Sequence, residues 1–416
     1  MILFLRLLKE SLSFALNQLK VNKLRTILSL LGITIGIFAI ISVFTIIDSM
    51  ERSIRDSIAT LGSNVVYVQK WPWSFGGNYP WWKYMNRPQP SLDDHKAIEE
   101  RARKVKASAF IVSTSRTVYY HDNYAENNSI VAATHDYHKI RDFELSKGRY
   151  FSYFESKSGK NKAILGADLA KDLFRNIDPV GKDIKVAGRK AQVIGIFKKE
   201  GEDMFNSSMD NTVFLPLNYV KNFFDIKSGR LNPFIMIEAE PGITNAELKD
   251  ELRRVLRSAH RLKPMAEDDF ALNEASLLSQ GFTSIFSSID LAGWIIGGFS
   301  ILVGGFGIAN IMFVSVKERT SIIGIQKALG AKRYFVLFEF LYEAVILSII
   351  GGGVGLLLIF IGTKIFNGMI DMDFALSVGN VIMGLVISGI IGVISGFAPA
   401  LKASKLNPVE AISATG

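Results

Sequence analysis

Four long stretches without a charged residue limit what this chain can fold into. The stretches are residues 26–47, 291–316, 344–363 and 374–401. Each has about 20 residues or more, the length that an α-helix needs to cross the ~30 Å hydrocarbon core of a bilayer. A backbone in lipid must satisfy its hydrogen bonds internally, so each stretch is expected to be helical. The sequence therefore predicts four membrane-spanning helices, at residues 25–48, 286–316, 334–366 and 374–401.

The charged residues lie largely outside these stretches, and many of them fall in residues 49–285. Charged residues make up 21% of the chain although its mean hydropathy is +0.23, which requires that apolar and charged segments be segregated. The segment contains short β-branched or aromatic runs bounded by polar residues or glycine, as strands do. These runs are residues 65–68, 117–120, 130–134 and 192–197. We therefore predict a large α+β domain inserted between the first two membrane helices.

The internal organisation of this domain is less clearly marked in the sequence. Thr244 and Glu247 have the spacing of a capping box, followed by apolar residues on one helix face. The pattern fits either one domain or two subdomains. In the second case the inner boundary is expected near residues 144–150, with a return to the first subdomain after Pro233.

Basic residues cluster at the two ends of the chain and in the loop at residues 317–333. They are Arg6, Lys9, Lys20, Lys23, Arg25, Lys317, Arg319, Lys327, Lys332, Arg333, Lys402 and Lys405. Short basic segments stay in the cytoplasm. Both termini, the loop and the tail at residues 402–416 are therefore predicted to be cytoplasmic, and the α+β domain lies outside. This topology explains most of the net charge of +9, so no nucleic-acid partner is expected.

Residues 1–24 carry apolar side chains at helical spacing, with polar residues largely on the other side. This pattern is typical of an amphipathic helix on the cytoplasmic surface of the membrane. The alternative is a longer first membrane helix. The apolar stretch that follows exceeds the ~7–15 residues of a signal-peptide core, so the first helix is expected to be retained.

The sequence contains no pattern for catalysis, nucleotide binding or metal binding. It has no cysteine, which excludes thiol chemistry and cysteine metal sites. The P-loop pattern and the G-x-S-x-G and H-E-x-x-H patterns are also absent. We therefore predict no enzymatic activity, no directly bound cofactor and no metal site in this chain.

Glycine pairs four residues apart occur in three of the predicted membrane helices. The pairs are Gly32 and Gly36, Gly293 and Gly297, and Gly351 and Gly355. Small residues at this spacing allow helices to approach closely. We predict that these glycines lie at helix–helix contacts, within the bundle or between two copies of the chain.

Four of the five tryptophans fall in one short segment of the external domain, with proline and glycine between them. They are Trp71, Trp73, Trp81 and Trp82. Clustered aromatic side chains favour contact with a partner, a lipid or an apolar ligand. A loop folded onto its own domain is an equally good interpretation.

The loop after the second membrane helix combines apolar and charged residues. Ile322, Ile325 and Leu329 share one side of a short helix, with charges around them. An exposed apolar helix of this kind suits a groove on a partner protein, although a helix lying on the surface without a partner has the same pattern. Glu339 and Glu343 lie on one face of the next helix, where they either pair with Lys332 or Arg333 or mark a functional site.

Several short motifs, in this order and topology, resemble one family along essentially the whole chain. They lie at residues 22–36, 148–151, 165–166, 173–174, 179–182, 193–196, 310–331, 399–403 and 406–411. The sequence resembles the permease subunits of MacB/FtsX-type ABC transporters, which include macrolide-exporter and lipoprotein-releasing permeases. The family usually has charged residues where this chain has Ser321, Ile322 and Gln326, which affects the polar contacts expected of this loop.

The resemblance implies a bacterial inner-membrane protein that works with a separate cytoplasmic ABC ATPase and a second permease copy, identical or not. ATP and magnesium would be bound by the ATPase. The ATPase-coupling residues would be Lys317, Glu318, Arg319, Ile322, Ile325, Lys327 and Leu329. ATP-driven closure would be transmitted through the helices to the periplasmic domain.

Three functions are compatible with such mechanotransmission. The leading one is efflux of a periplasmic substrate to an adaptor and an outer-membrane duct. The second is lipoprotein release, in which the tryptophan segment meets acyl chains. The third is a signalling subunit that regulates a cell-envelope partner.

Overall fold

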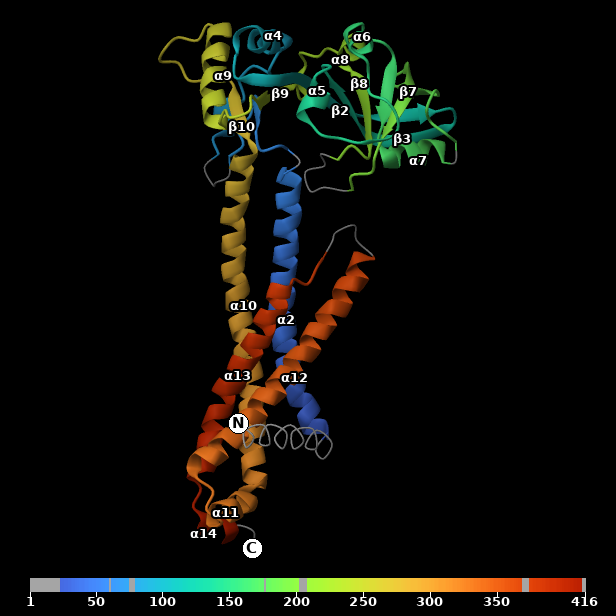
Figure 1. The fold of residues 1–416 in the computed structure, drawn as a ribbon. Coiled ribbons are helices and arrows are strands. Elements are labelled where there is room, and N and C mark those ends of the chain that lie inside the picture. The colour runs from blue at the N-terminus through green and yellow to red at the C-terminus, as the bar shows by residue number, and fades with distance from the viewer. Residues whose placement is uncertain are drawn as a thin grey trace. The chain divides into compact units, whose positions relative to one another are not determined.

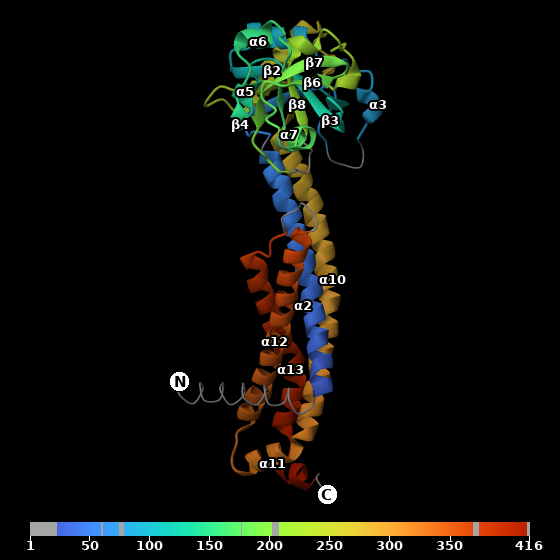
Figure 2. The ribbon, with the colours of Figure 1, turned by 90° about the vertical axis from the view of Figure 1, so that its right-hand side faces the viewer.

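The computed structural model describes residues 23–59, 61–74, 79–175, 177–201, 208–368 and 374–413. Contacts within the chain divide it into two units, Met1–Glu51 with Ile285–Gly416, and Arg52–Ser284. We name them the helical unit and the α+β unit and describe each by itself (Figures 1 and 2). The amphipathic helix predicted at residues 1–24 lies almost wholly outside the described residues.

The helical unit is built on four helices that are long and apolar enough to cross a membrane. They are α2 (Lys23–Ala59), α10 (Ala275–Glu318), α12 (Arg333–Asn367) and α13 (Val378–Lys405). Four candidate membrane helices were predicted and four are present among the described residues, although α2 continues to Ala59 and α10 begins at Ala275, beyond the predicted ends. The helices pack around a shared apolar core that includes Ile37 of α2, Met312 of α10, Phe340 of α12 and Ala400 of α13.

Two short helices complete the described part of this unit. Helix α11 (Thr320–Ala328) follows α10, and α14 (Pro408–Ser413) follows α13. They lie together at one end of the helical unit in both ribbon views (Figures 1 and 2). The segment predicted as a cytoplasmic tail, residues 402–416, thus contains the last turn of α13 and the whole of α14.

The α+β unit contains a ten-stranded sheet. Its strands are β1 (Val65–Gln69), β2 (Val105–Tyr120), β3 (Asn123–Ala133), β4 (Leu145–Gly148), β5 (Lys162–Leu165), β6 (Asp183–Val186), β7 (Arg189–Phe197), β8 (Thr212–Pro216), β9 (Phe234–Ala239) and β10 (Ala271–Glu274). The order is β10-β1-β9-β2-β3-β8-β5-β7-β4, and β6 pairs with both β2 and β7. The β3–β8 and β5–β7 pairs are parallel and the others are antiparallel.

Strand β2 belongs to two parts of this sheet. Its first half pairs with β9, from Val105 to Ile111, in an open layer that also contains β1 and β10. Its second half pairs with β3 and β6, and the pairings β2-β3-β8-β5-β7-β6-β2 close into a ring. The chain therefore passes from one part to the other within β2. Residues 144–150, where a subdomain boundary was considered, hold β4 at the far end of the sheet, and the return after Pro233 coincides with β9.

Alternating side chains of these strands pack into two separate cores. Val66, Val68 and Phe110 belong to one cluster, whereas Val65 and Tyr67 belong to the other. This is the period of two that a strand imposes when both faces of a sheet are covered. The helices of the unit are α3 (Trp81–Tyr84), α4 (Leu92–Arg101), α5 (Tyr137–Ile140), α6 (Tyr153–Lys157), α7 (Ala167–Phe174), α8 (Leu217–Val220) and α9 (Asn245–Ala259).

Helices α4 and α9 pack against each other and against strands of the open layer (Figure 1). Both begin with a capping box. In α9, the Thr244 hydroxyl accepts from the Glu247 amide and the Glu247 carboxylate accepts from the Thr244 amide, as the sequence predicted. In α4, Ser91 and Asp94 make the same exchange. Each box satisfies amide groups that a helix start leaves without partners.

A histidine joins the end of α9 to the start of α4. The ring of His260 lies 2.6 Å from the Asp269 carboxylate through Nδ1 and 2.9 Å from the Asp94 carboxylate through Nε2. The hydrogen bond to Asp94 and the bond to Asp269 raise the pKa of His260 to about 9. Burial alone would raise the pKa of Asp94, but its bonds with His260 and Ser91 outweigh burial and lower it.

Because of this cluster, we expect the unfolding free energy of the α+β unit to fall in alkaline solution. Because the pKa of His260 is raised on folding, its contribution is complete below about pH 6.5 and is lost as the pH rises through about 9. We expect His260→Gln to lower the unfolding free energy of the α+β unit by about 2 kcal/mol at pH 6.5 and by much less at pH 10. Thermal unfolding across this pH range tests the expectation, with the exposed His121 changed to Gln as control. An equal loss at both pH values would contradict it.

Candidate functional site

Helix α11 is held against α14 at the end of the helical unit. Ile323 of α11 is buried in the core of the helical unit, and Ala411 of α14 is buried as well. A methyl group built on Gly324 would lie 2.8 Å from the Ala411 side chain, so the two helices approach as closely as a glycine allows. The short α11 helix is thus part of a packed pair, and its orientation is fixed by α14.

Two of the predicted coupling residues point back into the helical unit. The guanidinium of Arg319 lies 3.2 Å from the Glu343 carboxylate of α12, and only 12% and 5% of the two side chains are exposed. The Lys327 ammonium donates to the Ser404 carbonyl, at 3.0 Å, and to the Leu406 carbonyl at the end of α13. These bonds attach both ends of α11 to α12 and α13. The sequence left two alternatives for Glu339 and Glu343: pairing with Lys332 or Arg333, or a functional site. The structure pairs Glu343 with Arg319, because Arg319, at the start of α11, lies beside α12.

The other predicted coupling residues are exposed. Lys317 and Glu318 lie exposed at the end of α10. Ile322 and Ile325 are about half exposed, and Leu329 is 85% exposed. Helix α14 adds Val409 and Ile412, which are exposed as well. We define the end patch as the side chains of Ile322, Ile325, Leu329, Val409 and Ile412.

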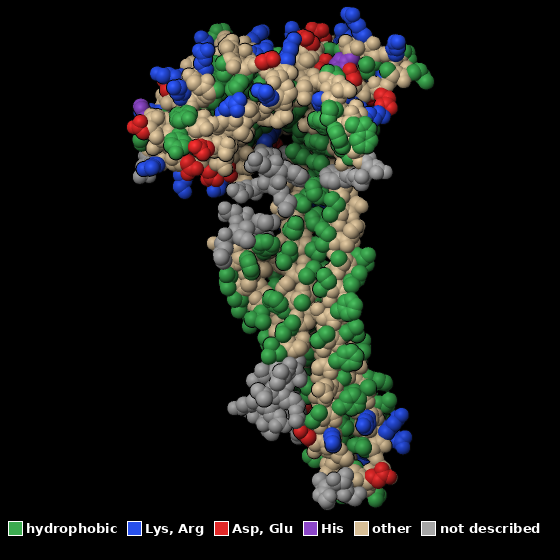
Figure 3. Space-filling view, turned by 180° about the vertical axis from the view of Figure 1, so that it is seen from behind, with side chains coloured by type: hydrophobic (Ala, Val, Ile, Leu, Met, Phe, Trp, Pro, Cys, Tyr) green, Lys and Arg blue, Asp and Glu red, His purple; other side chains and the backbone are tan. Residues whose placement is uncertain are grey.

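The two α14 residues were missed by the sequence interpretation. Val409 and Ile412 are three residues apart just after Pro408, a residue favoured at the first position of a helix. That spacing is the signal that was available. In the space-filling view, apolar side chains are spread along the length of the helical unit, and the charged side chains of this unit gather at its lower end in the picture (Figure 3).

The predicted packing glycines lie largely where helices approach each other. A methyl group on Gly36 would lie 2.9 Å from the Ser300 carbonyl oxygen, and one on Gly297 would lie 2.3 Å from the Ile40 side chain. Gly293 similarly faces Val43 at 3.3 Å. These three glycines bring α2 and α10 together.

The remaining predicted glycines are Gly351 and Gly355 on α12, which face α2, and Gly32 on α2 itself. Methyl groups on Gly351 and Gly355 would lie 3.1 Å from Ile33 and 3.0 Å from the Thr34 carbonyl oxygen. Gly32 has no described atom within 4 Å of the position of an added methyl group, although a methyl on Gly304 would lie 3.3 Å from the Gly32 carbonyl oxygen. Helix α10 therefore approaches the backbone of Gly32, and the position of its missing side chain is open.

The tryptophan segment is partly folded onto the α+β unit. Trp73 packs on Tyr67, with ring centroids 5.1 Å apart, and its amide donates to the Asn273 side chain at 2.9 Å. Trp71, Trp81 and Trp82 remain exposed, Trp82 by 64%. A loop folded onto its own domain is thus the interpretation that holds for Trp73, and contact of the three exposed tryptophans with a partner, a lipid or an apolar ligand stays a prediction.

Comparisons with known proteins cover most of the chain. Residues 26–255 match the family described as MacB-like periplasmic core domain, and residues 294–408 match the FtsX-like permease C-terminal family. The macrolide export ATP-binding/permease protein MacB of Bdellovibrio bacteriovorus is 29% identical over 97% of this chain. The chain spans 61% of the length of that relative. An uncharacterized ABC transporter permease of Bacillus subtilis, YknZ, is 30% identical over 97% of this chain and 99% of its own length.

Two solved structures were also similar in part. The periplasmic region of MacB from Actinobacillus actinomycetemcomitans has 16% identity and a TM-score of 0.44, covering 55% of this chain and 97% of that structure. The extracellular domain of YknZ, from Gram-positive bacteria, has 19% identity and a TM-score of 0.38, covering 50% and 99%.

Proposed function

Because the chain belongs to the MacB/FtsX-type family of ABC transporter permeases, we propose that it transmits the conformational cycle of a cytoplasmic ATPase to its α+β unit. The α+β unit then acts outside the cytoplasmic membrane and drives a substrate onward from there. The sequence has no P-loop, so the nucleotide site belongs to a partner domain or polypeptide. A second permease copy completes the assembly.

The end patch is the observation that carries this proposal. Five apolar side chains are exposed on α11, on the residue that follows it and on α14, whereas Ile323 and Ala411 of the same two helices are buried. Exposed apolar side chains on a short helix suit a groove on a partner protein. The bonds of Arg319 and Lys327 attach the same helix to α12 and α13. A partner that moves the end patch would therefore move the membrane helices with it.

The charge distribution supports a cytoplasmic location for this end. Five basic residues lie in the end turns of the membrane helices or directly beside them: Lys317 at the end of α10, Lys332 and Arg333 at the start of α12, and Lys402 and Lys405 at the end of α13. Basic residues next to membrane helices favour the cytoplasmic side. In the chain, the α+β unit comes between the parts of α2 and α10 that belong to the helical unit, which favours a location on the opposite side of the membrane.

Efflux is the transport activity that we propose, with an adaptor that accepts the substrate outside the membrane. Support comes from relatives named as macrolide export proteins, which this chain matches over nearly its whole length. Those relatives also carry regions beyond the part matched here. Their substrate is therefore not transferred to this chain.

We expect Leu329→Asp to abolish binding of the ATPase. Leu329 is the most exposed member of the end patch, and a carboxylate there would be buried without a partner in an apolar groove. The test is purification of the full chain in mild detergent after co-expression with its ATPase, with the P-loop protein identified by mass spectrometry. The amount retained should fall about tenfold or more.

Leu329→Met is the matched control, because it keeps an apolar side chain of similar volume. This variant should retain the ATPase. Equal retention by the native chain and Leu329→Asp would place the ATPase elsewhere and overturn the role of the end patch.

A further inference from the structure

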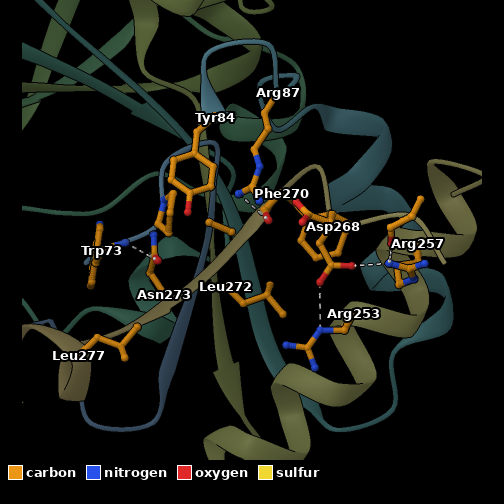
Figure 4. Close-up of a pocket in the computed structure, with 14 residues that line it drawn as sticks. Trp73, Tyr84, Arg87, Arg253, Arg257, Asp268, Phe270, Leu272, Asn273 and Leu277 are labelled. Carbon is orange, nitrogen blue, oxygen red and sulfur yellow. Dashed lines mark hydrogen bonds and ion pairs between the residues drawn. The ribbon is translucent and has the colours of Figure 1, made fainter. Parts of the chain in front are cut away.

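The α+β unit has a cavity beside the tryptophan segment that the coupling function does not use. Its volume is about 580 Å³. Trp73, Tyr84 and Phe270 supply aromatic walls, and Arg87, Arg253 and Arg257 supply cationic groups (Figure 4). The edge strand β10 forms part of the wall through Leu272 and Asn273. The cavity thus combines flat apolar surfaces with guanidinium groups.

Two of the three arginines are neutralised by a carboxylate in the same wall. Arg257 lies 2.6 Å from one oxygen of Asp268, and Arg253 lies 3.1 Å from the other. Figure 4 shows both side chains converging on Asp268 from α9. The second acidic residue of the wall, Glu267, is bound by Lys83 at 2.7 Å. These groups form a salt-bridge network that is largely satisfied within the protein.

Arg87 differs from the other two. Its guanidinium donates to the Phe270 carbonyl at 3.1 Å and lies over the Tyr84 ring, 4.5 Å from the centroid. Among the described residues, no carboxylate lies within ion-pair distance of it. The positive charge of Arg87 is therefore not compensated by the protein around the cavity, and its position is fixed by Tyr84 and Phe270.

We propose that this cavity binds an amphipathic anion. A phosphate, sulfate or carboxylate group would bind Arg87, and an apolar body containing a ring would lie against Trp73 and Tyr84. Guanidinium groups bind such anions through charge-assisted hydrogen bonds, and aromatic side chains supply apolar contact area. The volume is that of a small-molecule site. This assigns a role to the part of the tryptophan segment that faces the cavity.

The test uses the full chain in phosphatidylcholine nanodiscs and measures binding of 2-naphthyl phosphate by equilibrium dialysis, with empty nanodiscs subtracted. Binding should be saturable. 2-Naphthol, which lacks the charge, and inorganic phosphate, which lacks the apolar body, should each bind about tenfold more weakly or worse. Arg87→Gln should weaken binding of 2-naphthyl phosphate by about tenfold, and Arg87→Lys should retain part of it.

Arg254→Gln is the matched control, since Arg254 is an exposed neighbour of Arg253 on α9 outside the cavity wall. It should bind as the native chain does. Equal binding by the native chain and a folded Arg87→Gln variant would overturn the proposal, as would equal binding of 2-naphthol and 2-naphthyl phosphate by the native chain.

A second set of nanodiscs distinguishes the two sources of such an anion. If a lipid headgroup fills the cavity, adding phosphatidylglycerol to the bilayer will weaken binding of 2-naphthyl phosphate to the native chain. If the ligand is a soluble molecule, binding will not change. Neither result depends on the ATPase, and the Leu329→Asp variant should bind 2-naphthyl phosphate normally. The coupling proposal and this one can therefore fail separately.

Discussion

Replacing Glu343 by methionine should destabilise the helical unit by about 3–5 kcal/mol, because it leaves the nearly buried guanidinium of Arg319 without the carboxylate that faces it. Arg319→Met should have an effect of similar size for the opposite reason. The double variant, with methionine at both positions, should be less destabilised than either single variant, since it removes both charges of the pair together. Unfolding in detergent micelles, followed by circular dichroism, measures the three differences.

The control for this cycle is Lys405→Met, which removes an exposed cation from the end of α13. It should change stability by less than about 0.5 kcal/mol. Additive losses from the two single variants would show that Arg319 and Glu343 do not interact. The attachment of α11 to α12 would then rest on apolar packing alone. Under the coupling proposed above, loss of this pair should also weaken transmission from the ATPase, because it loosens the start of α11.

Gly392→Leu should prevent α12 and α13 from packing. A methyl group at this position would already lie 2.4 Å from the Ser348 hydroxyl and 2.7 Å from the Cα atom of Val345. The second contact is with backbone, so a change of rotamer cannot relieve it. We expect a loss of about 3 kcal/mol or more, seen as a lower thermal midpoint and a smaller monodisperse fraction in size-exclusion chromatography.

Gly389→Leu is the matched control on the same helix. No described atom outside the helix backbone lies within 4 Å of a methyl group built there. Leucine also has a higher helix propensity than glycine, so this variant should be as stable as the native chain. If the two variants behave alike, the contact at Gly392 does not determine the packing of α12 on α13.

The membrane helices were predictable because their signal is local. Length and the absence of charge decide whether a segment such as residues 344–363 can cross a bilayer, and both are read directly from the sequence. The capping box at Thr244 is local too, since its two partners are three residues apart. The assignment to a permease family came from short motifs, which are local as well.

Contacts between distant helices were not predictable in the same way. Glu343 is closer in sequence to Lys332 and Arg333 than to Arg319, yet its partner is Arg319, 24 residues away. The contact of Gly392 with Ser348 also joins two different helices. Sequence spacing predicts neighbours within one helix, whereas these contacts depend on how one helix crosses another.

The sequence predicted only part of each candidate site, because residues close in sequence can be recognised together and residues brought together by packing cannot. The apolar residues of α11 are spaced as one helix face and were recognised, but Val409 and Ile412 join them only because α14 packs on α11. The tryptophan segment was recognised from composition. The cavity beside it also needs Arg253 and Arg257 from α9, about 180 residues further along the chain.

The long strand β2 has a mechanical consequence for the α+β unit. The open layer and the closed ring both hydrogen-bond to this one strand, and the pairing with β9 ends at Ile111, where the pairing with β3 begins. The two parts are therefore joined by a paired strand in place of a flexible linker. A linker would let one part rotate while the other stayed at rest. A shared strand instead obliges both to move together unless its hydrogen bonds break. A force applied to the open layer would thus displace the closed ring as well, because the shared strand bends less than an unpaired linker would.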